Sequence, residues 1–286
     1  MNKGILLIAI GHEDYKKMAY NLAASIKVND KELPVALATD AVIPDCFASL
    51  FNKVINVPEK YYTISGKKDY LKSKLFAYDL SPWDETIFLD VDQILVPGKK
   101  ISPVFDELKE IDITFSNTGP SDVSVWADVA EVKKVYGDKP FWNFHSEFFY
   151  FKKNDRVKKY FKEAKLIYER SGLKSAFSFA GGRMADELAF QIAAMVIGLY
   201  PHKNNWMPNF WHVRFPKLRH LYPYQLTEYL TYSIGGANMP PSVKMNYNTL
   251  AAHYFYQLKL QNPYKAKDKR AFLPSRNQTI NYVTGY

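Results

Sequence analysis

The stretch Ile87-Phe88-Leu89-Asp90-Val91-Asp92 decides the fold, because an apolar run leads directly into two acids. A continuous apolar run of β-favouring residues is typical of a strand buried on both faces of a sheet. Side chains two positions apart on a strand point to the same side, so we expect Asp90 and Asp92 to converge just beyond the sheet edge. Two carboxylates held that close predict a hard divalent cation, Mn²⁺ or Mg²⁺. A solvated turn after the strand is the structural alternative.

Patterns typical of strands and helices alternate along the chain. Strands are predicted at residues 4–10, 34–39, 53–57, 111–116 and 143–151. Helices are predicted at residues 15–27, 71–80, 101–108, 128–135 and 155–171, and from residue 186 onward. Strands that alternate with helices indicate an α/β fold with a largely parallel sheet.

The carboxyl ends of the first two predicted strands are the expected nucleotide site, since nucleotides bind there in open α/β sheets. The residues placed to meet the base and ribose are Ile10, Gly11, His12 and Tyr15. Asp40, at the end of the second strand, is expected either to contact the base or ribose or to cap the next helix. The chain has no glycine-rich phosphate fingerprint, which argues against a Rossmann dehydrogenase or a P-loop enzyme.

The predicted helix before the acids carries Lys74-Leu75, and Lys74 stands sixteen residues before Asp90. This arrangement of lysine-bearing helix, apolar strand and Asp-x-Asp resembles the nucleotide-sugar-binding half of the GT-A glycosyltransferases, most closely family 8, which includes glycogenin and bacterial galactosyltransferases. The resemblance implies a central mixed, mostly parallel sheet flanked by helices. It also implies a UDP-hexose donor bound by Lys74 and by a metal on Asp90 and Asp92, with Val91 among the donor-binding residues.

Two later segments of the chain carry the resemblance toward the donor sugar. In the family, a Phe-Asn-Ser/Ala-Gly-Val-type strand lines the sugar, and this chain has His145 in place of Asn and Glu147 in place of Gly. We count both as site residues, with Glu147 in the chemistry. The structural alternative is that the two side chains hydrogen-bond to each other or to nearby backbone. An Asp-Gln-x-x-Leu-Asn segment implies that Asp186 lies against the sugar, with Glu187 in place of Gln. Acids in a helix's first turn also suit its dipole and cap its amides.

The resemblance extends loosely to the C-terminal region. In the family, a late His followed by Gly and Lys-Pro-Trp supplies the third metal ligand and a lysine for the diphosphate. His253 and Lys259 match this order, although the Gly is absent and Asn262-Pro263-Tyr264 replaces Lys-Pro-Trp. An imidazole ligand would favour Mn²⁺ over Mg²⁺.

The net charge of +9 is located entirely in the last third of the 286-residue chain. Residues 201–286 contain seven Lys and four Arg against two acids, whereas residues 1–200 are balanced. We therefore divide one domain into a catalytic core, 1–200, and a basic, aromatic-rich region, 201–286, that completes the metal and acceptor site. Basic residues interleaved with aromatic ones indicate a partner such as DNA or an anionic membrane surface, and a solvated basic face is the alternative.

These observations predict a metal-dependent glycosyltransferase, with retention implied by the resemblance. The expected acceptor is a glycan or a lipid-linked saccharide. One alternative is transfer to DNA that bears hydroxylated bases, and another is a non-catalytic protein that binds a nucleotide sugar. The single cysteine excludes an internal disulfide, and no apolar stretch is long enough to span a membrane, so we expect a cytoplasmic protein.

Overall fold

The computed structural model describes residues 2–124, 126–170, 184–204, 208–211, 221–235 and 241–263. Its strands are β1 (Lys3–Ala9), β2 (Val35–Thr39), β3 (Lys53–Asn56), β4 (Thr63–Ile64), β5 (Lys67–Lys68), β6 (Glu85–Leu89), β7 (Gln93–Leu95), β8 (Ile113–Pro120), β9 (Trp142–Lys152), β10 (Asn209–Trp211) and β11 (Thr231–Ser233). Its α-helices are α1 (Glu13–Asn29), α2 (Asp45–Ala48), α3 (Ala77–Leu80), α4 (Ser102–Glu107), α5 (Val129–Tyr136), α6 (Asp155–Arg170), α7 (Asp186–Ile197) and α8 (Pro241–Gln257). Short 3₁₀ helices are η1 (Glu59–Tyr62), η2 (Tyr70–Phe76) and η5 (Pro223–Gln225).

A six-stranded sheet of order β3-β2-β1-β6-β9-β8 forms the centre of the molecule. Neighbours among β3, β2, β1 and β6 pair in parallel, whereas β9 runs antiparallel to both β6 and β8. The predicted mixed, mostly parallel sheet is therefore confirmed. Because β1, β2 and β6 run the same way, the residues that follow them meet at one edge.

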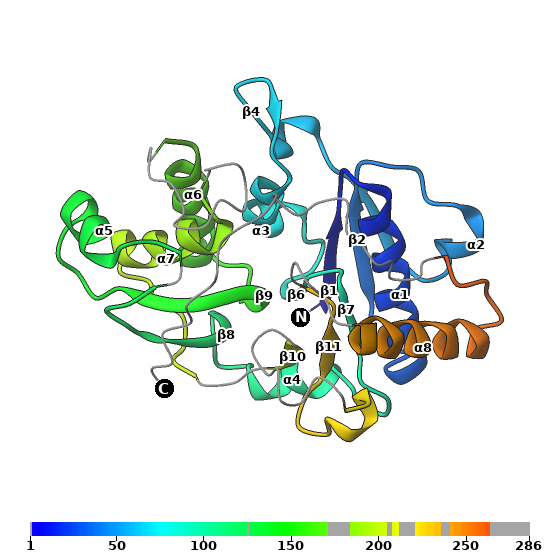
Figure 1. Cartoon of the computed structure of the whole chain (residues 1–286). Coiled ribbons are helices and arrows are strands. Elements are labelled where there is room, and N and C mark those ends of the chain that lie inside the picture. Colours follow the sequence, from blue (N-terminus) through cyan, green and yellow to red (C-terminus); the bar gives the residue numbers. More distant parts are fainter. Residues whose placement is uncertain are drawn as a thin grey trace.

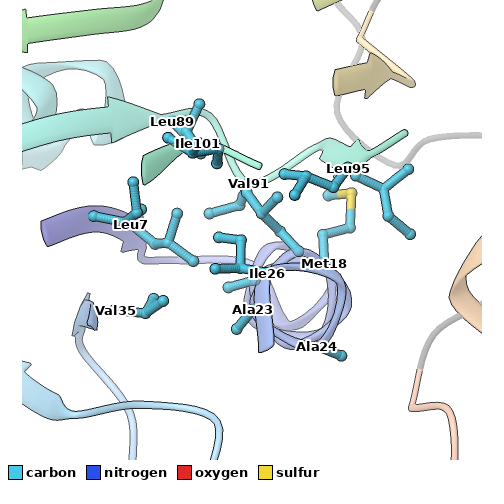
Figure 2. Packing of buried hydrophobic residues seen from close by; sticks show 14 of the residues in the cluster. Leu7, Met18, Ala23, Ala24, Ile26, Val35, Leu89, Val91, Leu95 and Ile101 are labelled. Atoms are coloured by element: carbon cyan, nitrogen blue, oxygen red, sulfur yellow. The ribbon is translucent and has the colours of Figure 1, made fainter. Parts of the chain in front are cut away.

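Helices cover both faces of the sheet (Figure 1). Along β1, Ile5 and Leu7 join a core cluster with α1, α4 and α8, whereas Leu6 joins a second cluster with α3, α5, α6 and α7. This alternation follows from the two-residue period of a strand. Figure 2 shows the first cluster, in which Leu7 and Leu89 of the sheet lie with Ile26 of α1. The sheet is thus the middle layer of three.

The C-terminal region packs onto the first of these faces. Strands β10 and β11 form a small sheet with β7, and α8 lies beside α1 (Figure 1). The Tyr254 hydroxyl of α8 donates a hydrogen bond to the Leu95 carbonyl of β7 at 2.8 Å. In the described part of the chain, no helix has the length and apolarity needed to cross a membrane.

Two predicted elements differ in the structure. The helix expected over residues 71–80 is instead the 3₁₀ helix η2 followed by the short α3. The Ser73 hydroxyl donates to the Tyr70 carbonyl at 2.7 Å, an i−3 contact that suits the tighter 3₁₀ winding. Strand β8 also continues to Pro120, four residues beyond its expected end.

Candidate functional site

The acids Asp90 and Asp92 lie in the turn between β6 and β7, where the Gln93 amide donates to the Asp90 carbonyl at 3.3 Å. The alternation of a strand therefore does not set the direction of their side chains, and the expected strand geometry is wrong at this point. The Val91 side chain is only 6% exposed and packs into the core cluster of Figure 2. Only the backbone of Val91 could therefore meet a donor.

The Lys74 side chain joins four elements at this edge of the sheet. Its ammonium nitrogen lies 3.0 Å from Asp90 Oδ1 at the end of β6 and 3.1 Å from Asp186 Oδ2 at the start of α7. It also donates to the Ser146 hydroxyl of β9 at 3.1 Å. The structure thus brings Lys74 together with Asp90 and Asp186, which are far apart in the sequence. The three residues form one cluster.

The charges of this cluster act strongly on one another. Burial alone would lower the pKa of Lys74, but Asp186 and Asp90 outweigh it and raise that pKa well above its usual value. Burial raises the pKa of Asp90 to about 7 against the opposing effect of Lys74, and the charges of Asp92 and Asp186 add to the rise. Burial and the neighbouring Asp186 also raise the pKa of Glu187 well above its usual value. Asp90, Asp186 and Glu187 therefore share the positive charge of one ammonium.

Asp186 is the first residue of α7, but it does not cap that helix. The N-cap is Ala185, which has no side-chain capping bond. The Asp186 carboxylate instead accepts a hydrogen bond from the Ser146 hydroxyl at 2.7 Å and pairs with Lys74. For Asp186 the capping alternative is therefore wrong, because its side chain is turned toward the cluster, whereas the Glu187 carboxylate makes a hydrogen bond to its own backbone.

Strand β9 brings His145 and Glu147 beside the cluster. Glu147 Oε1 accepts from the Ser116 hydroxyl at 3.0 Å, and Glu147 Oε2 lies 4.0 Å from His145 Nδ1. The pairing of β8 with β9 shifts register between Phe115 and Ser116, which marks a bulge at this point. The charge of Glu147 also acts on Glu187. The 4.0 Å separation from His145 is longer than a hydrogen bond, so Glu147 is held by Ser116 and lies next to the acids.

The carboxyl ends of β1 and β2, where the nucleotide is expected, contain a second group of charged side chains, Lys16 and Asp40. Asp40 Oδ2 accepts from the Gly11 amide at 3.1 Å, and Asp40 Oδ1 lies 3.2 Å from Lys16 Nζ. Lys16 in turn donates to the Gly11 carbonyl at 3.3 Å. Helix α2 has Pro44 as its N-cap, with no side-chain capping bond, so the alternative role of Asp40 as a helix cap is wrong.

The loop after β1 is tightly fitted. Gly11 has φ +80°, and a Cβ at this position would lie 2.7 Å from the Tyr70 ring. His12 is the N-cap of α1, where its Nδ1 accepts from the Asp14 amide at 3.2 Å. Ile10 is 4% exposed, and the half-buried Tyr15 packs against the first core cluster. Gly11 and His12 are therefore the residues of this loop whose surface is open.

His253 and Lys259 do not join the cluster. His253 lies on the exposed side of α8, where its Nε2 is 2.6 Å from Gln257 Nε2. Lys259 is exposed just beyond α8. No group of three or more His, Cys, Asp or Glu side chains could hold a metal ion within the described ranges. Among the described residues His253 is therefore not brought together with Asp90 and Asp92, and its role as a third ligand, with the preference for Mn²⁺ that it implies, stays a prediction.

Sequence reasoning missed Ser146 and Lys16. Ser146 occupies the Ser/Ala position of the sugar-lining segment, a signal that was present in the sequence. Nothing in the helical pattern of α1 distinguishes Lys16 from its neighbours.

Eight of the eleven basic residues in 201–286 lie outside the described residues, so the predicted basic surface for DNA or membrane does too.

Comparisons with known proteins bear on the fold. No protein-family model and no curated protein sequence matches the chain. Among solved structures, the bifunctional glycosyltransferase WbbM matches with a TM-score of 0.57 and 12% identity, over 90% of this chain and 51% of WbbM. An active-site mutant of LgtC matches with a TM-score of 0.52 and 14% identity, over 87% and 95% of the two chains. GlyE from Streptococcus pneumoniae TIGR4 matches with a TM-score of 0.51 and 11% identity, over 96% and 66%.

The chain has the GT-A glycosyltransferase fold. It spans about half the length of WbbM and nearly all of LgtC. The expected fold class is confirmed, and the cluster around Lys74 lies at the sheet edge where α/β folds bind nucleotides.

Proposed function

We propose that the chain is a glycosyltransferase that moves a sugar from a nucleotide-diphosphate donor to an acceptor. The observation that carries this proposal is the joining of Lys74 to Asp90 and Asp186 at the end of β6, within a GT-A fold. The resemblance to family 8 in the Lys74 spacing supports a UDP-hexose donor and retention of configuration.

A divalent cation suits the turn of Asp90 and Asp92. Both side chains offer oxygen ligands, and Mg²⁺ is commonly held by one or two carboxylates together with substrate phosphates. Burial and the charges of Asp92 and Asp186 raise the pKa of Asp90, so a cation at this carboxylate would relieve the repulsion. Asp90 and Asp92 would hold the ion, which when bound would supply positive charge beside the leaving diphosphate.

The residues of the chain have distinct proposed roles around the sugar–phosphate bond. Negative charge builds on the diphosphate as this bond breaks, and the ammonium of Lys74 is already fixed at the site by three partners. Asp186, oriented by Ser146, would face the sugar and stabilise its developing positive charge. Glu187, whose pKa is raised by burial and by the neighbouring Asp186, would lie beside Asp186 at the sugar. Glu147 would contact the sugar from β9.

The nucleoside would lie over the loop of Gly11 and His12. Asp40 and Lys16 hold this loop from the end of β2 and from α1. Backbone groups of the loop would then be fixed before the donor arrives, which lowers the ordering cost of binding.

For the acceptor we propose a glycan or a lipid-linked saccharide. The concentration of basic charge in residues 201–286 supports DNA with hydroxylated bases as the second candidate. A non-catalytic nucleotide-sugar-binding protein is less consistent with a cluster in which Lys74, Asp90 and Asp186 are all present and paired.

The test of the enzyme class is Mn²⁺-dependent or Mg²⁺-dependent release of nucleoside diphosphate from a panel of nucleotide sugars. We expect release with one donor, and loss of at least about a hundredfold in rate for Asp92→Asn, because the metal charge is lost. Asp138→Asn is the matched control, since that side chain is 90% exposed, and it should keep the wild-type rate. An unchanged rate for Asp92→Asn would remove the metal from the proposal, and no release from any donor would favour the binding protein.

The acceptor is tested by adding either oligosaccharides or duplex DNA that bears 5-hydroxymethylated pyrimidines. Faster release with the saccharide would support the proposal, whereas faster release with DNA would replace it with the second candidate. DNA binding should weaken steeply with salt because counterions are released, and a neutral saccharide should show little such dependence.

A further inference from the structure

Gln93 is the residue after Asp92 and the first residue of β7, and its side chain is fully buried. A buried amide is stabilised when both its nitrogen and its oxygen have hydrogen-bond partners, because an unpaired one loses its hydration without compensation. The partners of Gln93 come from two strands that are distant in the sequence. These partners allow the polar side chain of Gln93 to be buried next to the turn of Asp90 and Asp92.

The first partner is on β9. The side-chain amide nitrogen of Gln93, Nε2, donates to the Glu147 backbone carbonyl at 2.7 Å. The same carbonyl accepts the backbone amide of Asp90 at 2.9 Å. One oxygen of β9 therefore holds the first acid of the turn and the residue that follows the second acid. It also fixes the backbone of Glu147, whose side chain lies beside Glu187.

The second partner is on β11, in the C-terminal region. The Thr231 hydroxyl donates to the amide oxygen of Gln93 at 2.7 Å. This bond decides which way the amide is turned, since only the oxygen can accept it. The backbone amide of Ile234 donates to the Asp92 carbonyl at 2.9 Å. The turn that carries Asp90 and Asp92 is thus held between β9 and β11.

We propose that Gln93 is a positioning residue for the divalent cation, with Thr231 holding its amide in the working orientation. This inference rests on the proposed function, because it takes Asp90 and Asp92 as the ligands. Hydrogen bonds behind metal ligands orient them, and their loss typically weakens metal affinity about 10–100-fold. The C-terminal strand β11 thereby contributes to the metal site without offering a ligand.

The test is Mn²⁺ titration of the metal-free full chain by calorimetry, with and without UDP, alongside thermal unfolding. Gln93→Met keeps the size of the side chain and removes both hydrogen bonds, and we expect Mn²⁺ affinity to fall about 10–100-fold. Thr231→Val removes one bond and should give a smaller loss. Thr231→Ser keeps the hydroxyl and should remain near wild type.

The matched control is Gln191→Met. Gln191 is also fully buried, and its amide donates to a β9 carbonyl, that of Phe144, at 3.1 Å. It lies in α7 and has no bond to the acid turn. We expect this variant to unfold at a lower temperature, as Gln93→Met does, while its Mn²⁺ affinity stays at the wild-type value.

Three outcomes would overturn the inference, and they can be told apart. Equal Mn²⁺ affinity in Gln93→Met and Gln191→Met would reduce Gln93 to a structural residue and leave the proposed function standing. If Gln93→Met does not fold, equal affinity in Thr231→Val and Thr231→Ser decides against the inference in the same way. Absence of Mn²⁺ binding by the wild type, with UDP present, would instead remove the metal site itself.

Discussion

Two lysines at the same edge of the sheet have different electrostatic surroundings. Lys16 faces one carboxylate, that of Asp40, and both side chains also bind the backbone of Gly11. Lys74 is shared among Asp90, Asp186 and Glu187. The first group pairs one ammonium with one carboxylate. The second group has three carboxylates around one ammonium, so it gains from a further cation, and its raised pKa values are typical of a functional site.

The largest effect that would break this comparison is expected from Lys74→Met. Removal of one partner of a buried ion pair leaves the other charge uncompensated and costs about 3–5 kcal/mol. Urea denaturation should show this loss in the free energy of unfolding, and addition of Asp186→Asn to the same chain should recover part of it. Lys16→Met should cost less, because the Gly11 amide remains bound to Asp40. Equal losses for the two lysines would contradict the comparison.

A divalent cation should stabilise only the second group. Mn²⁺ at a hundredfold excess over its dissociation constant adds about 2.7 kcal/mol to the free energy of unfolding if it binds the folded chain alone. Thermal unfolding should show a rise in Tm that EDTA reverses. Asp92→Asn should abolish the rise and Asp40→Asn should preserve it. Loss of the rise in Tm in Asp40→Asn would mean that the ion binds at Asp40 rather than at Asp90 and Asp92.

The fit of the Gly11 loop gives an effect of intermediate size. Gly11→Ala should lower the free energy of unfolding by about 1–3 kcal/mol, because φ is +80° and the new Cβ would meet the Tyr70 ring. Gly98→Ala is the matched control, with φ +77° and no atom within 4 Å of the added Cβ. The difference between the two variants measures the contact with Tyr70. No difference would show that backbone conformation alone matters at Gly11.

The smallest expected effect is the coupling between Lys16 and Asp40. A double-mutant cycle of Lys16→Met and Asp40→Asn should give an interaction energy of about 1 kcal/mol, typical of a partly buried pair in contact. Urea denaturation of the four chains measures it. Strict additivity of the two substitutions would mean that the Lys16–Asp40 pair adds no stability beyond its hydrogen bonds to Gly11. Lys16 and Asp40 would then not act as an ion pair.

The elements of the sheet were predictable because their signals are local. The apolar runs at 4–10 and 34–39 became β1 and β2, and the run before Asp90 became β6. A residue's type and its neighbours decide whether it can be buried on a sheet, so each strand is encoded within a few positions. The helical spacing around Lys74 also marked a real element, but the 3₁₀ winding of η2 depends on contacts that spacing does not describe.

Resemblance extended the prediction to residues that no local pattern would connect. It named Lys74 and Asp186, which lie 3.1 Å apart in the structure although more than a hundred positions separate them. It also named His253, where the expected sequence context is incomplete and the side chain lies on the exposed side of α8, apart from the cluster. A match of order along the chain therefore does not by itself predict contact.

The sequence by itself determined the α/β alternation, the burial of β6 and the presence of acids at its end, because hydrophobic period and residue type are properties of short segments. Only the tertiary structure decided that Asp90 and Asp92 lie in a turn, that Asp40 binds Gly11, and that Gln93 is held between β9 and β11. These features depend on hydrogen bonds and charges between segments that meet only after folding. Hydrogen bonds need their atoms about 3 Å apart and charge–charge energies fall with separation, so positions in space rather than positions in the chain decide them.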